Sequence, residues 1–158
     1  MRFVGSFAAL VLLLQAAPPS KLIPLDEATY SNTLAAKKGK VLLVNFWATW
    51  CEPCRKEMPQ LSKMSALLKA KGLEFVTISA DEPEDEKAAL AFLAKVGIAG
   101  PVYAKRAKND DNFINSIDPK WSGALPALIL YDKAGKKVKS WIGETDLKAL
   151  EAEVRKLL

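Results

Sequence analysis

The sequence predicts an α/β fold in which a central mixed β-sheet is flanked by helices on both faces. Residues 41–48 and 73–80 have the continuous apolar, β-branched and aromatic composition of strands that are covered on both faces. A helical pattern separates them, and a strand–helix–strand unit places its strands parallel. Residues 126–132 and 137–143 flank a short Gly-containing turn and predict an antiparallel hairpin, followed by a C-terminal helix.

Length and composition indicate one globular domain, which we expect to cover residues 21–158. The chain has 158 residues, of which 50% are hydrophobic, enough for a packed core. Its net charge of +5 comes from 23 basic and 18 acidic residues that are interspersed along the chain. Because no long basic stripe is present, nucleic acid is not an expected partner.

The first 20 residues, MRFVGSFAALVLLLQAAPPS, are expected to be a signal peptide and the start of a linker. A single Arg2 precedes the apolar run 3–14, and two small alanines follow, as in secretory signals. The run is shorter than the ~20 residues that span a bilayer, so an uncleaved membrane anchor is the less favoured alternative. The prolines within 18–24 predict a linker, and the protein is expected to be periplasmic or otherwise extracytoplasmic.

Two helices are predicted in the first half of the domain. Asp26 is a suitable N-cap for a helix that ends before Gly39. A second helix is predicted over 53–71, where apolar residues recur at helical spacing. Pro59 lies inside this segment and predicts a kink, and Gly72 marks the end.

The remaining elements are predicted from caps and short apolar runs. The acid-rich segment 81–86 suits the positive end of a helix macrodipole, and we expect these acids to be a solvated helix start rather than a metal site. A short strand is predicted over 101–104 and a short helix over 109–117. Thr145 or Asp146 caps the final helix.

The two cysteines of the chain, Cys51 and Cys54, lie in the segment Trp-Cys-Glu-Pro-Cys. A disulfide between them closes too small a loop to restrict the unfolded chain much, so a purely structural role is excluded first. A closed zinc site needs four ligands, and the chain has no histidine and no third cysteine. A redox pair is therefore favoured, while a metal site completed by carboxylates or shared in a dimer stays open.

The position of the pair between a buried strand and a helix supports redox chemistry. Cys51 is expected beside the unpaired N–H groups of the first helical turn, which favour thiolate over thiol. Cys54 follows one turn later on the same face, so a reversible disulfide can form. Pro53 fits the first turn without the loss of a hydrogen bond.

The stretch VLLVNFWATWCEPCRKEMPQL, together with GALPALILYDKAG, resembles the TlpA/ResA-type extracytoplasmic thiol-disulfide oxidoreductases, which have a thioredoxin-like fold. The resemblance extends over residues 22–158. It implies that Cys51 attacks a substrate disulfide, that Cys54 resolves the mixed disulfide, and that Pro126 forms a cis-proline loop facing the pair. It also implies that the backbone of Leu125 pairs with an incoming substrate strand, although the family more often has threonine there. Trp50 is expected at the rim of the site.

A base for Cys54 is expected from Glu57. Asn45 occupies the strand position at which cytoplasmic thioredoxins carry a buried acid, and an amide cannot relay a proton. Glu57 matches the glutamate that the resembled family places after its Cys-Glu-Pro-Cys motif, and we expect it to assist deprotonation of Cys54. An ordinary exposed helix glutamate is the alternative.

The direction of electron flow is predicted from Glu52 and Pro53, the residues between the cysteines. Strong oxidants depend on an unusually stable thiolate, and the negative charge of Glu52 opposes such stabilisation, so a disulfide reductase without a cofactor is expected. The resemblance implies disulfide-containing protein substrates, apocytochrome c among the candidates, and a membrane electron donor of the DsbD/CcdA type. The alternatives are a thiol oxidase or peroxidase on the same fold, or a metal-binding or redox-inert module.

Overall fold

The computed structural model describes residues 17–158, and the predicted signal sequence in residues 1–16 lies outside this part of the chain. The elements, in chain order, are β1 (Leu22–Leu25), α1 (Glu27–Ala35), β2 (Val41–Trp47), α2 (Glu52–Lys69), β3 (Leu73–Ser79), the 3₁₀ turn η1 (Pro83–Asp85), α3 (Glu86–Lys95), β4 (Val102–Lys105), α4 (Asp110–Ile117), β5 (Ala127–Tyr131), β6 (Lys137–Ile142) and α5 (Leu147–Leu157). Within residues 17–158 no helix is long and apolar enough to cross a bilayer.

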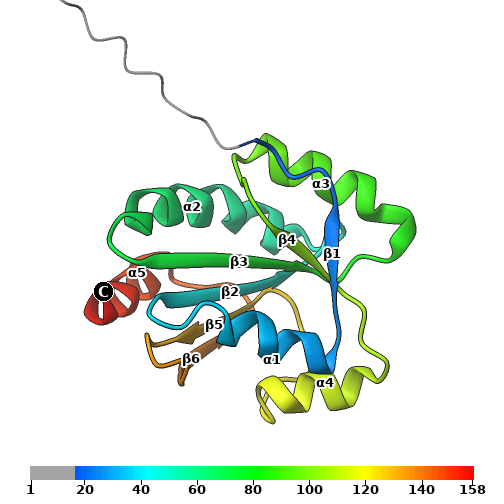
Figure 1. The fold of residues 1–158 in the computed structure, drawn as a ribbon. Coiled ribbons are helices and arrows are strands. Elements are labelled where there is room, and N and C mark those ends of the chain that lie inside the picture. Colours follow the sequence, from blue (N-terminus) through cyan, green and yellow to red (C-terminus); the bar gives the residue numbers. More distant parts are fainter. Residues whose placement is uncertain (1–16) are drawn as a thin grey trace, which may run out of the picture.

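The strands form one mixed sheet in the order β1-β4-β3-β2-β5-β6 (Figure 1). The first four pair in parallel, and β5 runs antiparallel to both β2 and β6. The central strand β2 is buried at every position, which explains its unbroken apolar composition. The predicted mixed sheet with a C-terminal hairpin and helix is thereby confirmed.

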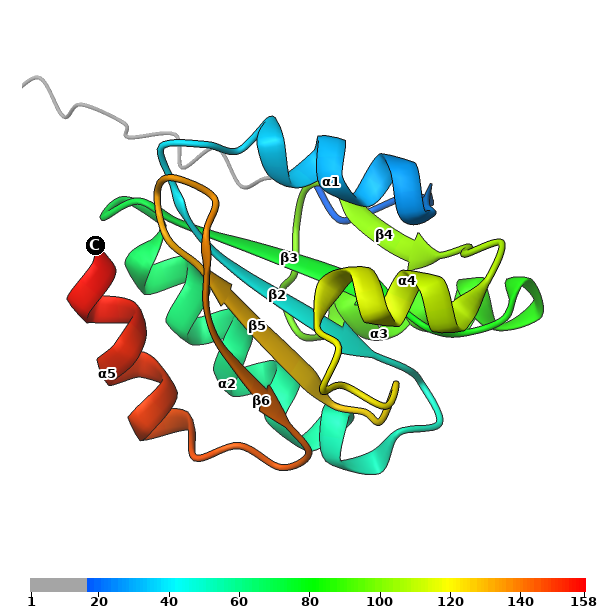
Figure 2. The same cartoon turned by 90° about the horizontal axis from the view of Figure 1, so that it is seen from below.

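Helices cover both faces of this sheet, as predicted. The aromatic cluster beneath α1 and α4 occupies one face, and Figure 2 shows these two helices together on that side. On the other face, α2 and α5 enclose an aliphatic cluster around Leu61 and Leu150. A third cluster, beneath α3, contains Trp47, Met58 and both cysteines. The redox pair therefore borders a packed core.

The predicted linker at 18–24 is wrong in its second half, because Leu22–Leu25 forms β1. This strand pairs only with β4 and lies at the edge of the sheet. Pro24, which lacks an N–H donor, is tolerated at an edge because only one side of the strand needs ladder hydrogen bonds. The leucines at both ends of β1 are buried, and their burial outweighs the proline signal.

Side-chain caps begin most of the helices at the predicted places. Asp26 accepts a hydrogen bond from Thr29 N at 2.9 Å, and Thr29 Oγ1 accepts one from Asp26 N in a reciprocal capping box. Asn109 caps α4, and Asp146 rather than Thr145 caps α5. The second helix continues through Pro59 as one element.

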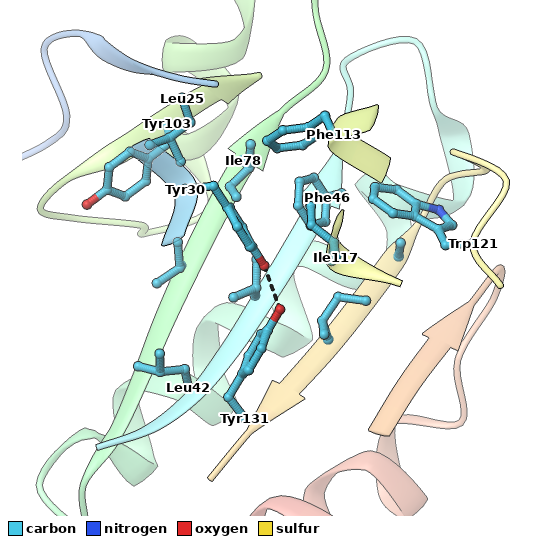
Figure 3. Close-up of a cluster of buried hydrophobic side chains, with 14 residues drawn as sticks. Leu25, Tyr30, Leu42, Phe46, Ile78, Tyr103, Phe113, Ile117, Trp121 and Tyr131 are labelled. Carbon is cyan, nitrogen blue, oxygen red and sulfur yellow. Dashed lines mark hydrogen bonds between the residues drawn. The ribbon is translucent and has the colours of Figure 1, made fainter. Parts of the chain in front are cut away.

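Two tyrosine hydroxyls meet inside the aromatic cluster (Figure 3). Tyr30 of α1 and Tyr131 of β5 are both buried, and their hydroxyl oxygens lie 2.8 Å apart. Burial raises the pKa of each phenol, so both remain neutral. The surrounding rings include Phe113, whose edge meets the ring of Tyr30 at a centroid distance of 5.6 Å. The pair connects the helical layer to the sheet.

Tyr30→Phe is expected to destabilise the protein by about 1–3 kcal/mol, because the hydroxyl of Tyr131 then stays buried without its partner. Tyr131→Phe should have a similar effect. The double variant should lose less free energy of unfolding than the two single variants lose together, since no unpaired hydroxyl remains in it. Urea unfolding of the four proteins measures this difference, and strictly additive costs would contradict the pairing.

Candidate active site

The site is built on a tight turn that joins the end of β2 to the start of α2. Cys51 N donates to Ala48 O at 3.2 Å and closes this turn, with Thr49 and Trp50 at its corners. Ala80 N donates to Trp47 O at 2.8 Å and holds the ends of β3 and β2 together. The turn is thus anchored to the carboxyl ends of two buried parallel strands.

Cys51 is the N-cap of α2. Its backbone is extended, with φ −84° and ψ 100°, and its Sγ accepts a hydrogen bond from Cys54 N at 3.4 Å. The sulfur therefore replaces the oxygen that usually caps a helix, as the sequence predicted. Negative charge on this atom is stabilised by the first-turn N–H group and by the helix dipole.

Cys51 and Cys54 form a disulfide, with their Cα atoms 5.3 Å apart. The Cys51 side chain is the more accessible of the two, with 5% of its residue surface exposed against 1% for Cys54. This asymmetry agrees with the predicted division between an attacking and a resolving cysteine.

The residues between the cysteines lie at the surface. Glu52 pairs with Lys56, its Oε1 lying 2.9 Å from Nζ, and both side chains are largely exposed. The hydrogen bond from Lys56 lowers the pKa of Glu52, so the carboxylate is ionised. Because Lys56 and solvent offset this charge, the predicted influence of Glu52 on Cys51 is weaker than the sequence position alone suggests. Pro53 lies in the first turn of α2, as expected.

Glu57 is buried rather than exposed, which rules out the ordinary surface glutamate. Only 9% of the residue surface is accessible. Its Oε1 accepts a hydrogen bond from Thr145 N at 2.7 Å, while Oε2 has no hydrogen-bond partner among residues 17–158. Burial raises the pKa of Glu57, against the opposing effect of the Thr145 N–H, and the charge of Glu144 raises it further.

The position of Glu57 places its carboxyl group near the redox pair and beside open space. It follows Cys54 by three residues on α2, so the two side chains share one face of the helix. A cleft of about 400 Å³ opens beside it. The cleft is lined by residues of α2, of the β6–α5 connection and of the start of α5, namely Pro53, Lys56, Glu57, Gln60, Glu144, Thr145, Asp146, Leu147 and Lys148.

The loop before β5 lies against the same core cluster. The Leu125–Pro126 peptide bond is cis, as the sequence resemblance implied. Leu125 is half-buried and packs against the cluster that contains both cysteines. Within the described part of the chain, the backbone of Leu125 makes no hydrogen bond to another backbone group. Trp50, in the turn directly before Cys51, has 67% of its surface exposed.

Asn45 occupies the buried position beneath α2. Its Nδ2 donates to the sulfur of Met58 at 3.5 Å, and its Oδ1 has no partner among residues 17–158. The amide carries no titratable proton, and the buried ionisable side chain of α2 is Glu57. Trp47 is fully buried and belongs to the core.

Asp81 is a buried acid that the sequence prediction placed on a solvated helix start. It is fully buried immediately after β3. Its carboxylate accepts hydrogen bonds from Thr49 N at 2.9 and 3.1 Å, from Thr49 Oγ1 at 2.6 Å and from Ser79 Oγ at 2.7 Å. The parallel register of β2 and β3, which pairs Trp47 with Ser79, brings the acid to the turn. The other acids of the segment are exposed or half-buried.

The described residues contain no group of three His, Cys, Asp or Glu side chains that could together hold a metal ion. The buried acids Asp81 and Glu57 each bind hydrogen-bond donors of the chain itself. The site therefore consists of a disulfide-bonded cysteine pair, two buried carboxyl groups and a half-buried loop.

The sequence profile of the Redoxin family matches residues 15–158. The chain belongs to the Redoxin family. Within this family it is TlpA/ResA-like, with 36% identity over 120 residues to thiol-disulfide oxidoreductase ResA of Bacillus thuringiensis. That alignment covers 76% of the chain but only 65% of the ResA sequence.

Solved structures of related proteins have the same fold. A thiol:disulfide interchange protein of the thioredoxin family from Chlorobium tepidum superposes with a TM-score of 0.63 at 25% identity, over 78% of this chain and 83% of that one. The thioredoxin domain of a thiol-disulfide oxidoreductase from Bacteroides vulgatus gives a TM-score of 0.61 at 28% identity, over 77% and 84%. The Redoxin-family chain is thus thioredoxin-like in fold.

Glu57→Gln is expected to change how stability depends on pH. Folding raises the pKa of Glu57 above its ordinary value of 4.5. At pH values between 4.5 and the raised pKa, the folded state therefore binds more protons than the unfolded state. The stability contribution of Glu57 is therefore complete below 4.5 and is lost as pH rises through the raised pKa. Urea unfolding from about pH 4 to about pH 7 should show the variant gaining stability relative to the parent protein.

Glu52→Gln is the matched control on the same helix. The pKa of Glu52 is lowered by its ion pair, so its contribution has the opposite sign and is lost as pH falls. This variant should not gain stability relative to the parent as pH rises. The same pH trend in both variants would contradict the assignment of a raised pKa to Glu57.

Proposed function

We propose that this chain is a thiol-disulfide oxidoreductase that reduces disulfides of extracytoplasmic proteins through the Cys51–Cys54 pair. The observation that carries the proposal is the N-cap position of Cys51, whose sulfur receives the Cys54 N–H. Such a position favours a reactive thiolate. The name of the ResA relatives supports the reaction class.

The reaction begins from the reduced dithiol. The Cys51 thiolate attacks one sulfur of a substrate disulfide, forming a mixed disulfide and releasing the other substrate sulfur as a thiolate. Cys54 then loses its proton and attacks the Cys51 sulfur, which breaks the mixed disulfide and releases the second substrate sulfur. Two electrons pass to the substrate, and the protein ends with the Cys51–Cys54 disulfide.

Glu57 is suited to accept the proton of Cys54 in the second step. The pKa of Glu57 is raised toward neutral pH, and a general base is most effective when its pKa is close to the pH at which it works. Its Oε2 has no partner within residues 17–158 and is free to bind a proton. The adjacent cleft connects this group to the surface, so the proton can leave to solvent.

The substrate chain is proposed to lie between Trp50 and the loop at Leu125. The unpaired backbone of Leu125 can form strand-like hydrogen bonds with an extended peptide, and Pro126 fixes the path of the loop. The exposed indole of Trp50 offers apolar contact area beside Cys51. Backbone pairing selects for extended, accessible segments rather than for a particular sequence.

The proposed location is extracytoplasmic, on the basis of the N-terminal signal pattern. In that oxidising environment a disulfide reductase needs an external supply of electrons. We propose a membrane donor of the DsbD/CcdA type, which would reduce the Cys51–Cys54 disulfide after each turnover. Apocytochrome c is the candidate substrate to test first, because its cysteines must be reduced before haem attachment.

Substitution of each cysteine tests the assigned roles. Cys51→Ser should abolish reduction of insulin disulfides, because the attacking sulfur is missing. Cys54→Ser should keep the first attack and accumulate mixed disulfides that non-reducing electrophoresis and mass spectrometry detect. Equal activity of the two variants would contradict the scheme, and the captured partners of Cys54→Ser would name the substrate.

The reduction potential separates a reductase from an oxidase on the same fold. Equilibration with glutathione buffers should give a value nearer to about −270 mV, typical of thioredoxin, than to about −120 mV, typical of DsbA. Glu52→Gln should shift the potential upward only slightly, since Lys56 already offsets the charge. A potential near that of DsbA would reject the reductase in favour of an oxidase.

A further inference from the structure

The turn that presents Cys51 is bound by a carboxylate from another strand. Thr49 donates both its backbone N–H and its hydroxyl to Asp81, at distances between 2.6 and 3.1 Å. Asp81 is fully buried, and Ser79 Oγ completes its set of donors. A buried carboxylate with this many short hydrogen bonds is a rigid attachment point, because each lost bond would leave part of a charge unsatisfied.

The attachment point is itself fixed to the rest of the fold. Asp81 N donates to Ser79 Oγ at 2.9 Å, and Arg106 Nη1 donates to Asp81 O at 2.8 Å. Arg106 also binds Glu86 through Nη2 at 2.6 Å. Asp81 is therefore connected directly to the end of β3 and to the residue after β4. Through Arg106 it is also connected to the start of α3.

Thr49 precedes Cys51 by two residues, so the position of its backbone limits where the sulfur can lie. The turn itself is closed by the Cys51 N–H to Ala48 O bond, which at 3.2 Å is longer than the bonds from Thr49 to Asp81. Without the bonds to Asp81, the turn could rotate and withdraw Cys51 from the N-cap. The thiolate would then lose contact with the first-turn N–H groups.

We propose that Asp81 is a positioning residue that acts through Thr49 to hold Cys51 at the head of α2 in its reactive form. This inference deepens the proposed oxidoreductase function and rests on it for its biological meaning. Asp81 itself does not touch the reacting sulfur atoms in this scheme. Its role is to keep the reduced pair in the geometry that the oxidised pair already has.

The test compares two substitutions that each remove one hydroxyl donor from the same carboxylate. Thr49→Val removes the donor on the turn, and Ser79→Ala removes the donor on the strand. Because Ser79 Oγ also accepts the Asp81 N–H, its loss disturbs the buried network at least as much. Direct replacement of Asp81 by alanine leaves several donors unpaired and endangers folding, so the two milder variants carry the test.

The readout is the rate at which iodoacetamide alkylates Cys51 in the fully reduced protein at neutral pH, followed by mass spectrometry. Thr49→Val is expected to lower this rate about tenfold, the factor that corresponds to the loss of one weak hydrogen bond to a charged group. Thr49→Ser, which keeps the hydroxyl, should restore the rate of the parent protein. Ser79→Ala should lower the rate less than Thr49→Val does, because Asp81 then keeps its bonds to Thr49, even where urea unfolding shows an equal loss of stability.

An unchanged rate in Thr49→Val overturns the proposal, and so does an equal decrease in Thr49→Val and Ser79→Ala. A decrease in Thr49→Ser as large as that in Thr49→Val also overturns it. Iodoacetamide needs no protein substrate, so this test is separate from the proposed function. A parent protein that fails to reduce insulin would reject the reductase without altering the comparison of alkylation rates.

Discussion

The chemistry of this protein depends on where β2 stops and α2 begins. The strand is buried along its whole length, so its end has a fixed place in the sheet. The turn from Ala48 to Cys51 then places the sulfur of Cys51 at the N-cap of α2. Helix-end N–H groups have no partners within the helix, and a thiolate can supply one. The free N–H group at the start of α2 thus has a sulfur atom as its partner.

Two buried carboxyl groups lie on either side of this helix head and differ in how well they are satisfied. Asp81 accepts hydrogen bonds at both oxygens and contributes rigidity. Glu57 has one bonded oxygen and one unpaired oxygen beside a cleft, so burial raises its pKa. The fully bonded carboxylate of Asp81 suits a structural support. The unbonded oxygen of Glu57 suits proton exchange, because it can bind a proton without the loss of a hydrogen bond.

The cluster on the opposite face of the sheet contains neither cysteine and meets the proposed site at Leu125. Its core is built from aromatic rings, and the buried hydroxyl pair of Tyr30 and Tyr131 joins α1 to β5 (Figure 3). Stability and reactivity are therefore located on different sides of one sheet. Variants in the aromatic layer change the free energy of unfolding while leaving the turn and the helix head in place.

The amino-acid sequence alone determined the local features, namely the parallel strand–helix–strand unit, the C-terminal hairpin, the helix cap at Asp26 and the redox pair at a helix start. These depend on periodicity and on residues close together in the chain. Tertiary structure decided what depends on distant neighbours. Burial of its leucines made β1 a strand despite Pro24, and the β6–α5 connection buried Glu57. The register of β2 and β3 places Asp81 beside the cysteine turn. This contact joins residues 32 positions apart, so no local sequence pattern could reveal it.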